Sequence, residues 1–70
     1  MLLNLKTAIA KHKVSAAKIS RIVGISEKAM SNKINEYTDF TRKEMYHIHR
    51  LFFKDEDFHE LFKSDKSVED

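Results

Sequence analysis

Polar residues between positions 26 and 35 carry the hydrogen-bonding groups that can recognise the edges of DNA bases. Lys28 can donate to the acceptors of guanine, Glu27 can accept from the amino group of cytosine, and Asn32 can pair with adenine. Met30 and Ile34 lie four residues apart, so in a helix both point inward on the same face. The spacing therefore predicts an opposite face that can read base edges, made of Glu27, Lys28, Ser31 and Asn32. The alternative is a solvated helix face without a ligand.

Positive charge is concentrated in the first half of the chain. Residues 1–35 contain seven Lys/Arg and one acidic residue, a balance of +6, whereas residues 36–70 contain six Lys/Arg and ten acidic residues, a balance of −4. This asymmetry predicts that the first half meets a polyanion. The candidates for phosphate contacts are polar and basic residues close to predicted helix ends and loops: Lys13, Lys18, Ser26, Lys33, Asn35, Arg42 and Lys43.

The elements that must position these residues are helices. The chain has one glycine and no proline, and no segment shows sustained β-branched alternation, so the fold class is predicted to be all-α. Apolar residues at helical spacing predict helices at residues 2–12, 16–23, 26–35 and from 42 onward, with a fifth short helix after the acidic cluster 55–57. The residues expected to cap or end them are Ser15, Gly24, Ser26, and Thr41 with Glu44.

The apolar residues of these helices predict the core. Ile19, Ile22 and Val23 are expected to face inward from the second helix, and Ile25 to fill the corner before the third. The inward stripe of the fourth helix is expected to be Met45, Ile48, Leu51 and Phe52. Residues 37–40 read as a loop.

The segment VSAAKISRIVGISEKAMSNKINEYTDFT, residues 14–41, resembles the phage repressor and Cro-like family of helix-turn-helix (XRE-type) DNA-binding proteins. The likeness covers residues 5–62, with its most specific marks at 14–15, 24–26, 30–31, 33–35 and 40–41. The resemblance implies a compact four- to five-helix repressor-like domain over residues 1–63, in which the second helix lies across the phosphate backbone and the third enters the major groove. It also implies a short stand-alone phage regulator that binds operator DNA in a lysis-lysogeny switch.

The sequence departs from the family pattern at four positions. Ala16 stands where the family commonly has a glutamine that contacts a phosphate, and Ser20 replaces the usual alanine. Lys33 stands where many members carry an aliphatic residue. Glu36 replaces the glycine that usually ends the third helix, so either Asn35 takes the left-handed position or the helix runs on.

Four phenylalanines crowd the last two helices and allow two interpretations. Phe52, Phe53, Phe58 and Phe62 either complete a small core or form a protein interface. An interface would suit a homodimer on an operator, since two-fold pairing places one helix of each subunit in successive major grooves. It would equally suit a second hypothesis for function, a co-repressor or antirepressor that binds another phage regulator through these aromatic helices.

Other function classes lack the residues they need. Without cysteine, a catalytic nucleophile arrangement, a glycine-rich loop or a ligand set, we expect no enzyme, no cofactor and no small-molecule substrate. His47 and His49 are two apart and point to different sides of a helix, so no metal site is expected. No apolar run approaches the length of a membrane span. We expect a cytoplasmic protein of a bacterium or phage-infected cell, with a flexible tail at residues 64–70.

Overall fold

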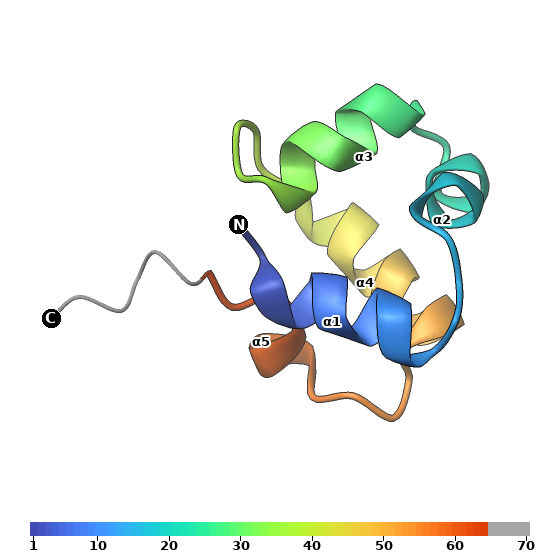
Figure 1. Ribbon diagram of the computed structural model, residues 1–70, viewed down its shortest axis with the longest axis vertical. Helices are drawn as coiled ribbons and strands as arrows, with labels where there is room; N and C mark the ends of the chain where they lie inside the picture. Colours follow the sequence, from blue (N-terminus) through green and yellow to red (C-terminus); the bar gives the residue numbers. More distant parts are fainter. Residues whose placement is uncertain (65–70) are drawn as a thin grey trace, which may run out of the picture.

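The computed structural model describes residues 1–64, and within them the fold is all-helical, as predicted. The helices are α1 (Leu3–Lys11), α2 (Ala16–Val23), α3 (Glu27–Ile34), α4 (Arg42–Phe52) and α5 (Phe58–Leu61). Figure 1 shows α4 running through the middle of the fold, with α3 above it, α2 at one end and α1 across its lower half. The predicted tail falls, apart from Ser64, on residues 65–70, which lie outside the described residues.

The helix starts are fixed by the predicted side-chain caps. Ser15 Oγ accepts from the Lys18 N–H at 3.0 Å, and Ser26 Oγ accepts from the Ala29 N–H at 3.0 Å. Each cap satisfies a backbone donor that has no partner within the helix. At α4, Thr41 and Glu44 form the reciprocal capping box. The prediction of where these three helices begin is therefore confirmed.

The core forms where α1, α2, α3 and α4 meet, and its side chains come from every helix. Five of them are fully buried: Leu5, Ile19, Met30, Ile48 and Phe53. Around them lie other apolar residues that are partly buried, including Val23 and Ile25. Burial of this apolar surface is the main stabilising contribution in so small a chain.

Two residues predicted to face inward are instead exposed. Ile22 on α2 is 51% exposed and Leu51 on α4 is 54% exposed. The reason at α4 is Phe53, which caps the helix with a non-helical backbone (φ −132°, ψ 42°) and is fully buried. The prediction from helical spacing assumed that the helix continues through residue 53, so it could not include the change in backbone direction at Phe53. The core position assigned to Leu51 is thus taken by the ring of Phe53.

Gly24 gives a direct test of the turn between α2 and α3. It adopts a left-handed conformation (φ +93°), and a Cβ placed there meets no atom within 4 Å. We therefore expect Gly24→Ala to lower the free energy of unfolding by about 1 kcal/mol through backbone strain alone. Gly24→Asn should cost less, because asparagine tolerates this conformation better. Urea unfolding of the two variants measures the difference, and an equal cost would contradict the assignment to backbone strain.

Within the described residues, none of the helices has the length and the apolar composition needed to cross a membrane.

Candidate nucleic-acid interface

The α2–α3 corner sets the direction of α3. The N–H groups of Gly24 and Ile25 both donate to the carbonyl of Ser20, at 2.8 and 2.9 Å. Ser20 is itself buried and donates from Oγ to the Ala17 carbonyl at 2.8 Å. A small residue is needed at this position because α2 and α3 pack directly on one another. The bend that the sequence predicts is present, and Ile25 packs partly buried at the corner.

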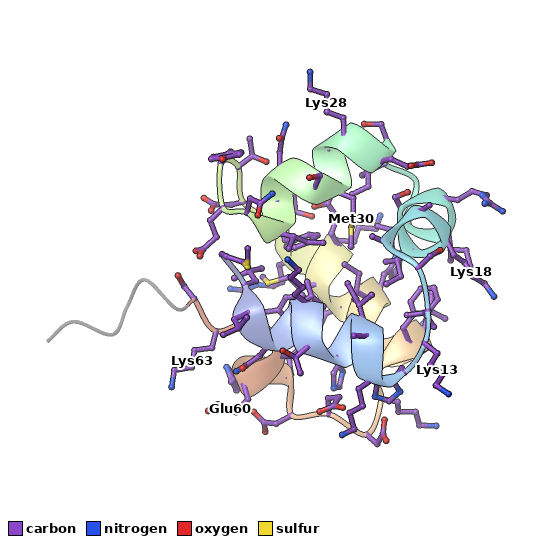
Figure 2. The ribbon with its side chains drawn as sticks, viewed as in Figure 1. Lys13, Lys18, Lys28, Met30, Glu60 and Lys63 are labelled. Atoms are coloured by element: carbon purple, nitrogen blue, oxygen red, sulfur yellow. The ribbon has the colours of Figure 1, made fainter. Side chains whose placement is uncertain are left out.

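The two faces of α3 differ in the way the spacing predicts. Met30 and Ile34 are buried, whereas Glu27, Lys28 and Ser31 are exposed. In Figure 2, Met30 points toward α4 and Lys28 points away from the rest of the molecule. Asn32 is only half-buried at the edge of this face. We call Glu27, Lys28, Ser31 and Asn32 the α3 face.

The remaining predicted site residues lie around α3, on the α2 side, at both ends of α3 and at the start of α4. Lys13 and Lys18 are exposed, and Figure 2 shows both leaving the molecule on the α2 side, away from Lys28. Ser26 is occupied as the cap of α3, and Asn35, half-buried, follows its last residue. Arg42 and Lys43 are exposed in the first turn of α4. The predicted residues therefore form a face with flanking cations rather than one compact cluster.

Lys33 requires a correction, because its ammonium group is held inside the fold. Nζ lies 3.0 Å from Glu44 Oε1 and donates to the Asp39 carbonyl at 3.0 Å. It also lies 5.8 Å from the centroid of the Phe40 ring. With 14% of its side chain exposed, Lys33 is committed to joining α3 to α4, and we remove it from the phosphate candidates. From the sequence, Glu44 was expected only to complete the capping box with Thr41, and its pairing with Lys33 was not predicted.

The charge on Glu44 is stabilised by the same contacts. Burial alone would raise the pKa of Glu44, but the Thr41 N–H at 2.9 Å and the Lys33 ammonium outweigh it, so the pKa is lowered from the ordinary value of 4.5. A carboxylate with a lowered pKa in the folded state stabilises the fold above its unfolded pKa, and this contribution is lost as the pH falls through the folded pKa.

Glu44→Gln separates this charge from the capping box, since glutamine can occupy the same position of the box. At pH 7 we expect the variant to be less stable by on the order of 1 kcal/mol, because the charge-assisted bond with Lys33 is lost. The difference should stay constant down to about pH 5 and shrink below it. Thermal unfolding of both proteins between pH 7 and pH 3 measures this, and a gap that does not narrow as the pH falls below 5 would contradict a role for the charge.

Glu36 shows how α3 ends, and both alternatives predicted for this position are wrong. Asn35 keeps a right-handed conformation (φ −81°), and Glu36 itself adopts the left-handed one (φ 67°). Its Oε1 accepts from the Met1 ammonium at 2.7 Å and from Ser64 Oγ at 2.8 Å. In the backbone, the Tyr37 N–H donates to the Asn32 carbonyl at 2.8 Å and the Glu36 N–H to the Lys33 carbonyl at 3.2 Å, the pattern by which a left-handed residue ends a helix. The bond from Ser64 joins the last described residue to the end of α3.

A hollow that the sequence did not predict lies beside the α3 face. It has a volume of about 410 Å³, and Ala16, Ala17, Glu27 and Ser31 are among its lining residues. Alanines at the start of α2 leave this space open, next to two residues of the α3 face. Ala16 stands where the resembling family commonly has a glutamine. With alanine at this position, no side chain from α2 supports Glu27 across the hollow.

The aromatic residues divide between core and surface. Phe53 is fully buried, with its ring edge-on to His12 at 5.1 Å, so it is a core residue and not part of an interface. The half-buried rings of Phe58 and Phe62 lie 5.3 Å apart. Phe52 is half-buried as well. Tyr46, which sequence reasoning missed, is 53% exposed and stacks on Phe58 at 5.1 Å.

A comparison of the chain with models of protein families, with curated proteins and with solved structures finds no match. Across residues 1–64, no three His, Asp or Glu side chains are placed to hold a metal ion. The function is therefore proposed from the sequence and the geometry of the chain itself.

Proposed function

We propose that this protein is a sequence-specific, duplex DNA-binding transcriptional regulator that inserts α3 into the major groove. The observation that carries the proposal is the division of α3 into two faces. Met30 and Ile34 anchor the helix in the core, and Lys28 projects from the opposite face (Figure 2). A helix held this way after a tight turn is the arrangement by which helix-turn-helix proteins present side chains to base edges.

Each side chain of the α3 face then has a defined role. Lys28 donates to O6 and N7 of guanine, and Glu27 accepts from the amino group of cytosine. Ser31 is exposed in the middle of the helix and can donate or accept. Asn32, being half-buried, contacts adenine only from the edge of the face. Lys28 carries the largest share of base recognition, because its long side chain is exposed and projects away from the protein body (Figure 2).

The flanking residues provide affinity without sequence information. Contacts from basic and polar side chains to phosphates fix the position of a protein on the duplex. In this proposal the phosphate contacts are made by Lys13, Lys18, Ser26, Asn35, Arg42 and Lys43.

The biological role we propose is that of a Cro-like or repressor-like protein in a phage genetic switch, acting in the cytoplasm of the bacterial host. It follows the resemblance of residues 14–41 to that family. A homodimer on the operator would place two copies of α3 in successive major grooves, about 34 Å apart. Pairing would compensate for the short reach of an eight-residue helix.

The second hypothesis, a modulator that captures another regulator through its aromatic helices, is less well supported. Phe53 is buried, and Phe52, Phe58 and Phe62 are half-covered by neighbouring rings. Much of their ring surface is therefore already packed within the protein, whereas a protein interface needs exposed apolar surface. The DNA-binding proposal also accounts for the concentration of positive charge in residues 1–35.

The proposal is tested by selecting sites from a pool of random DNA duplexes and then measuring affinity against salt concentration. We expect one enriched sequence, with an affinity that falls steeply as salt rises, because several phosphate contacts release counterions. Lys18→Ala and Lys43→Ala should each weaken binding to all sequences equally and reduce the salt slope by about 1. Lys63→Ala, on the far side of the molecule (Figure 2), is the matched control. No enrichment together with a flat salt response would overturn the proposal.

A further inference from the structure

The outward face of α4 carries positive charge of which the proposed function uses only the two residues of its first turn, Arg42 and Lys43. A hollow of about 930 Å³ opens along this face, and its lining combines four basic residues, two histidines and a tyrosine: Arg42, Lys43, Tyr46, His47, His49, Arg50 and Lys54. No acidic residue lines it. Four of the six Lys/Arg in residues 36–70 therefore gather on one face of a half that is acidic as a whole.

The four cations are also without acidic partners inside the fold. Over residues 1–64, none of them lies within 4.0 Å of a carboxylate, in contrast to Lys33 and Lys11. Of the three acidic residues that follow Lys54, Glu56 accepts from His12 and Lys11, which lowers its pKa, and Asp57 caps α5. The third, Asp55, is exposed and does not line the hollow. Unpaired charges of one sign along an open hollow attract a ligand of opposite charge.

The spacing of these charges suits a chain of phosphates better than a single phosphate group. Arg42, Tyr46 and Arg50 follow one another at intervals of four residues, so they share one face of α4. Arg42 and Arg50 are thus about 12 Å apart along the helix axis. A duplex on the α3 face can reach only the start of this line, because α4 begins beside the α3–α4 loop and runs away from α3 (Figure 1).

Tyr46 identifies the kind of phosphate chain. One side of its ring is stacked on Phe58 (5.1 Å, 24° between planes), while the side chain remains 53% exposed between Arg42 and Arg50. An aromatic ring supported from behind and flanked by cations is a platform for an unpaired base. The bases of a duplex are already stacked inside the helix and cannot reach such a ring.

We infer that the α4 hollow is a second nucleic-acid site that binds a single-stranded segment, with one base stacked on Tyr46 and the backbone on Arg42, Lys43, Arg50 and Lys54. The site takes no part in sequence-specific reading by α3, and the inference stands whether or not the α3 face binds duplex DNA. The protein then has two targets: a duplex at the α3 face and an unpaired strand at the α4 hollow.

The test uses the full chain and a fluorescently labelled strand of twelve deoxythymidines, with binding followed by anisotropy at low salt. We expect Arg50→Ala combined with Lys54→Ala to weaken strand binding about tenfold or more. The matched control, Lys6→Ala with Lys63→Ala, removes the same charge from two exposed positions outside both proposed sites and should change it less than twofold. Equal loss in both double variants would overturn the assignment to α4.

The ring is tested separately from the charge. Tyr46→Leu should weaken strand binding about five- to hundredfold, whereas Tyr46→Phe, which keeps the stacking surface, should bind like the original protein. Circular dichroism of both variants verifies that the fold is kept. Three results would overturn the inference: a strand of the same length without bases binding equally well, or deoxythymidine triphosphate or poly-glutamate competing as effectively as the strand at equal charge.

Discussion

Lys28→Ala is expected to weaken binding to the selected duplex by about 1 to 3 kcal/mol and to relax the base preference at one position of the site. Lys28 projects from the α3 face (Figure 2) and donates to guanine in the proposed complex. Its removal leaves guanine acceptors unsatisfied at the interface, which is why the loss should be large for one side chain. Affinities for the selected duplex and for each single-base change at the affected position measure both effects.

The control for Lys28 is a basic residue that contacts only phosphate in the proposed complex. Lys18→Ala removes the same charge, but it should weaken all duplexes by the same factor and leave the base preference intact. Stability should hardly change in either variant, since both side chains are exposed. If Lys28→Ala behaved like Lys18→Ala, with a uniform loss over every sequence, Lys28 would be a phosphate contact and the proposed reading of guanine would be wrong.

Phe53→Ala is expected to cost about 3 to 5 kcal/mol of unfolding free energy, enough to leave a chain of this size largely unfolded at 37 °C. The ring is fully buried among side chains of the core and lies edge-on to His12, so truncation leaves a cavity in the only core that the described residues share. Urea unfolding followed by circular dichroism measures the loss. Phe53→Leu should retain part of the stability and keep the variant measurable.

Two comparisons separate the core role of Phe53 from an interface role. Tyr37→Ala, at a side chain that is 79% exposed, should change stability by no more than about 0.5 kcal/mol. Phe58→Ala, half-buried, should fall between the two. An interface residue would instead make stability depend on protein concentration, so a Phe53→Ala variant that is stable as a monomer but no longer self-associates would refute the core assignment.

The sequence was sufficient for the features that depend on local chemistry. Ser15, Ser26 and the Thr41/Glu44 pair cap the helices that were predicted from them, because a cap involves residues only three apart. Gly24 ends α2 in the left-handed conformation for the same local reason. The division of α3 into a buried and an exposed face follows from its period alone.

The features that were missed depend on contacts between distant residues or on a change in backbone direction. Lys33 pairs with Glu44 across eleven positions, and nothing in the periodicity of α3 indicates this partner. Glu36 takes the left-handed position although it is not glycine, and its carboxylate binds the Met1 ammonium and Ser64, which are 35 and 28 positions away. The basic face of α4 was missed because its cations are scattered among the acidic residues of the second half, and only the folded helix brings them into one line.

The bond network of Lys33 has a mechanical consequence for the two proposed surfaces. Its ammonium joins the end of α3 to the Asp39 carbonyl and the Glu44 carboxylate at the start of α4, so these contacts oppose a movement of α3 relative to α4. They therefore help to fix the separation between the α3 face and the Tyr46 ring. When a duplex occupies the α3 face and an adjoining unpaired stretch reaches Tyr46, the length of that stretch sets its effective concentration at the α4 hollow. If both proposals hold, we expect an unpaired stretch of suitable length beside the duplex site to be held most tightly, and a stretch too short to span the two surfaces to gain nothing.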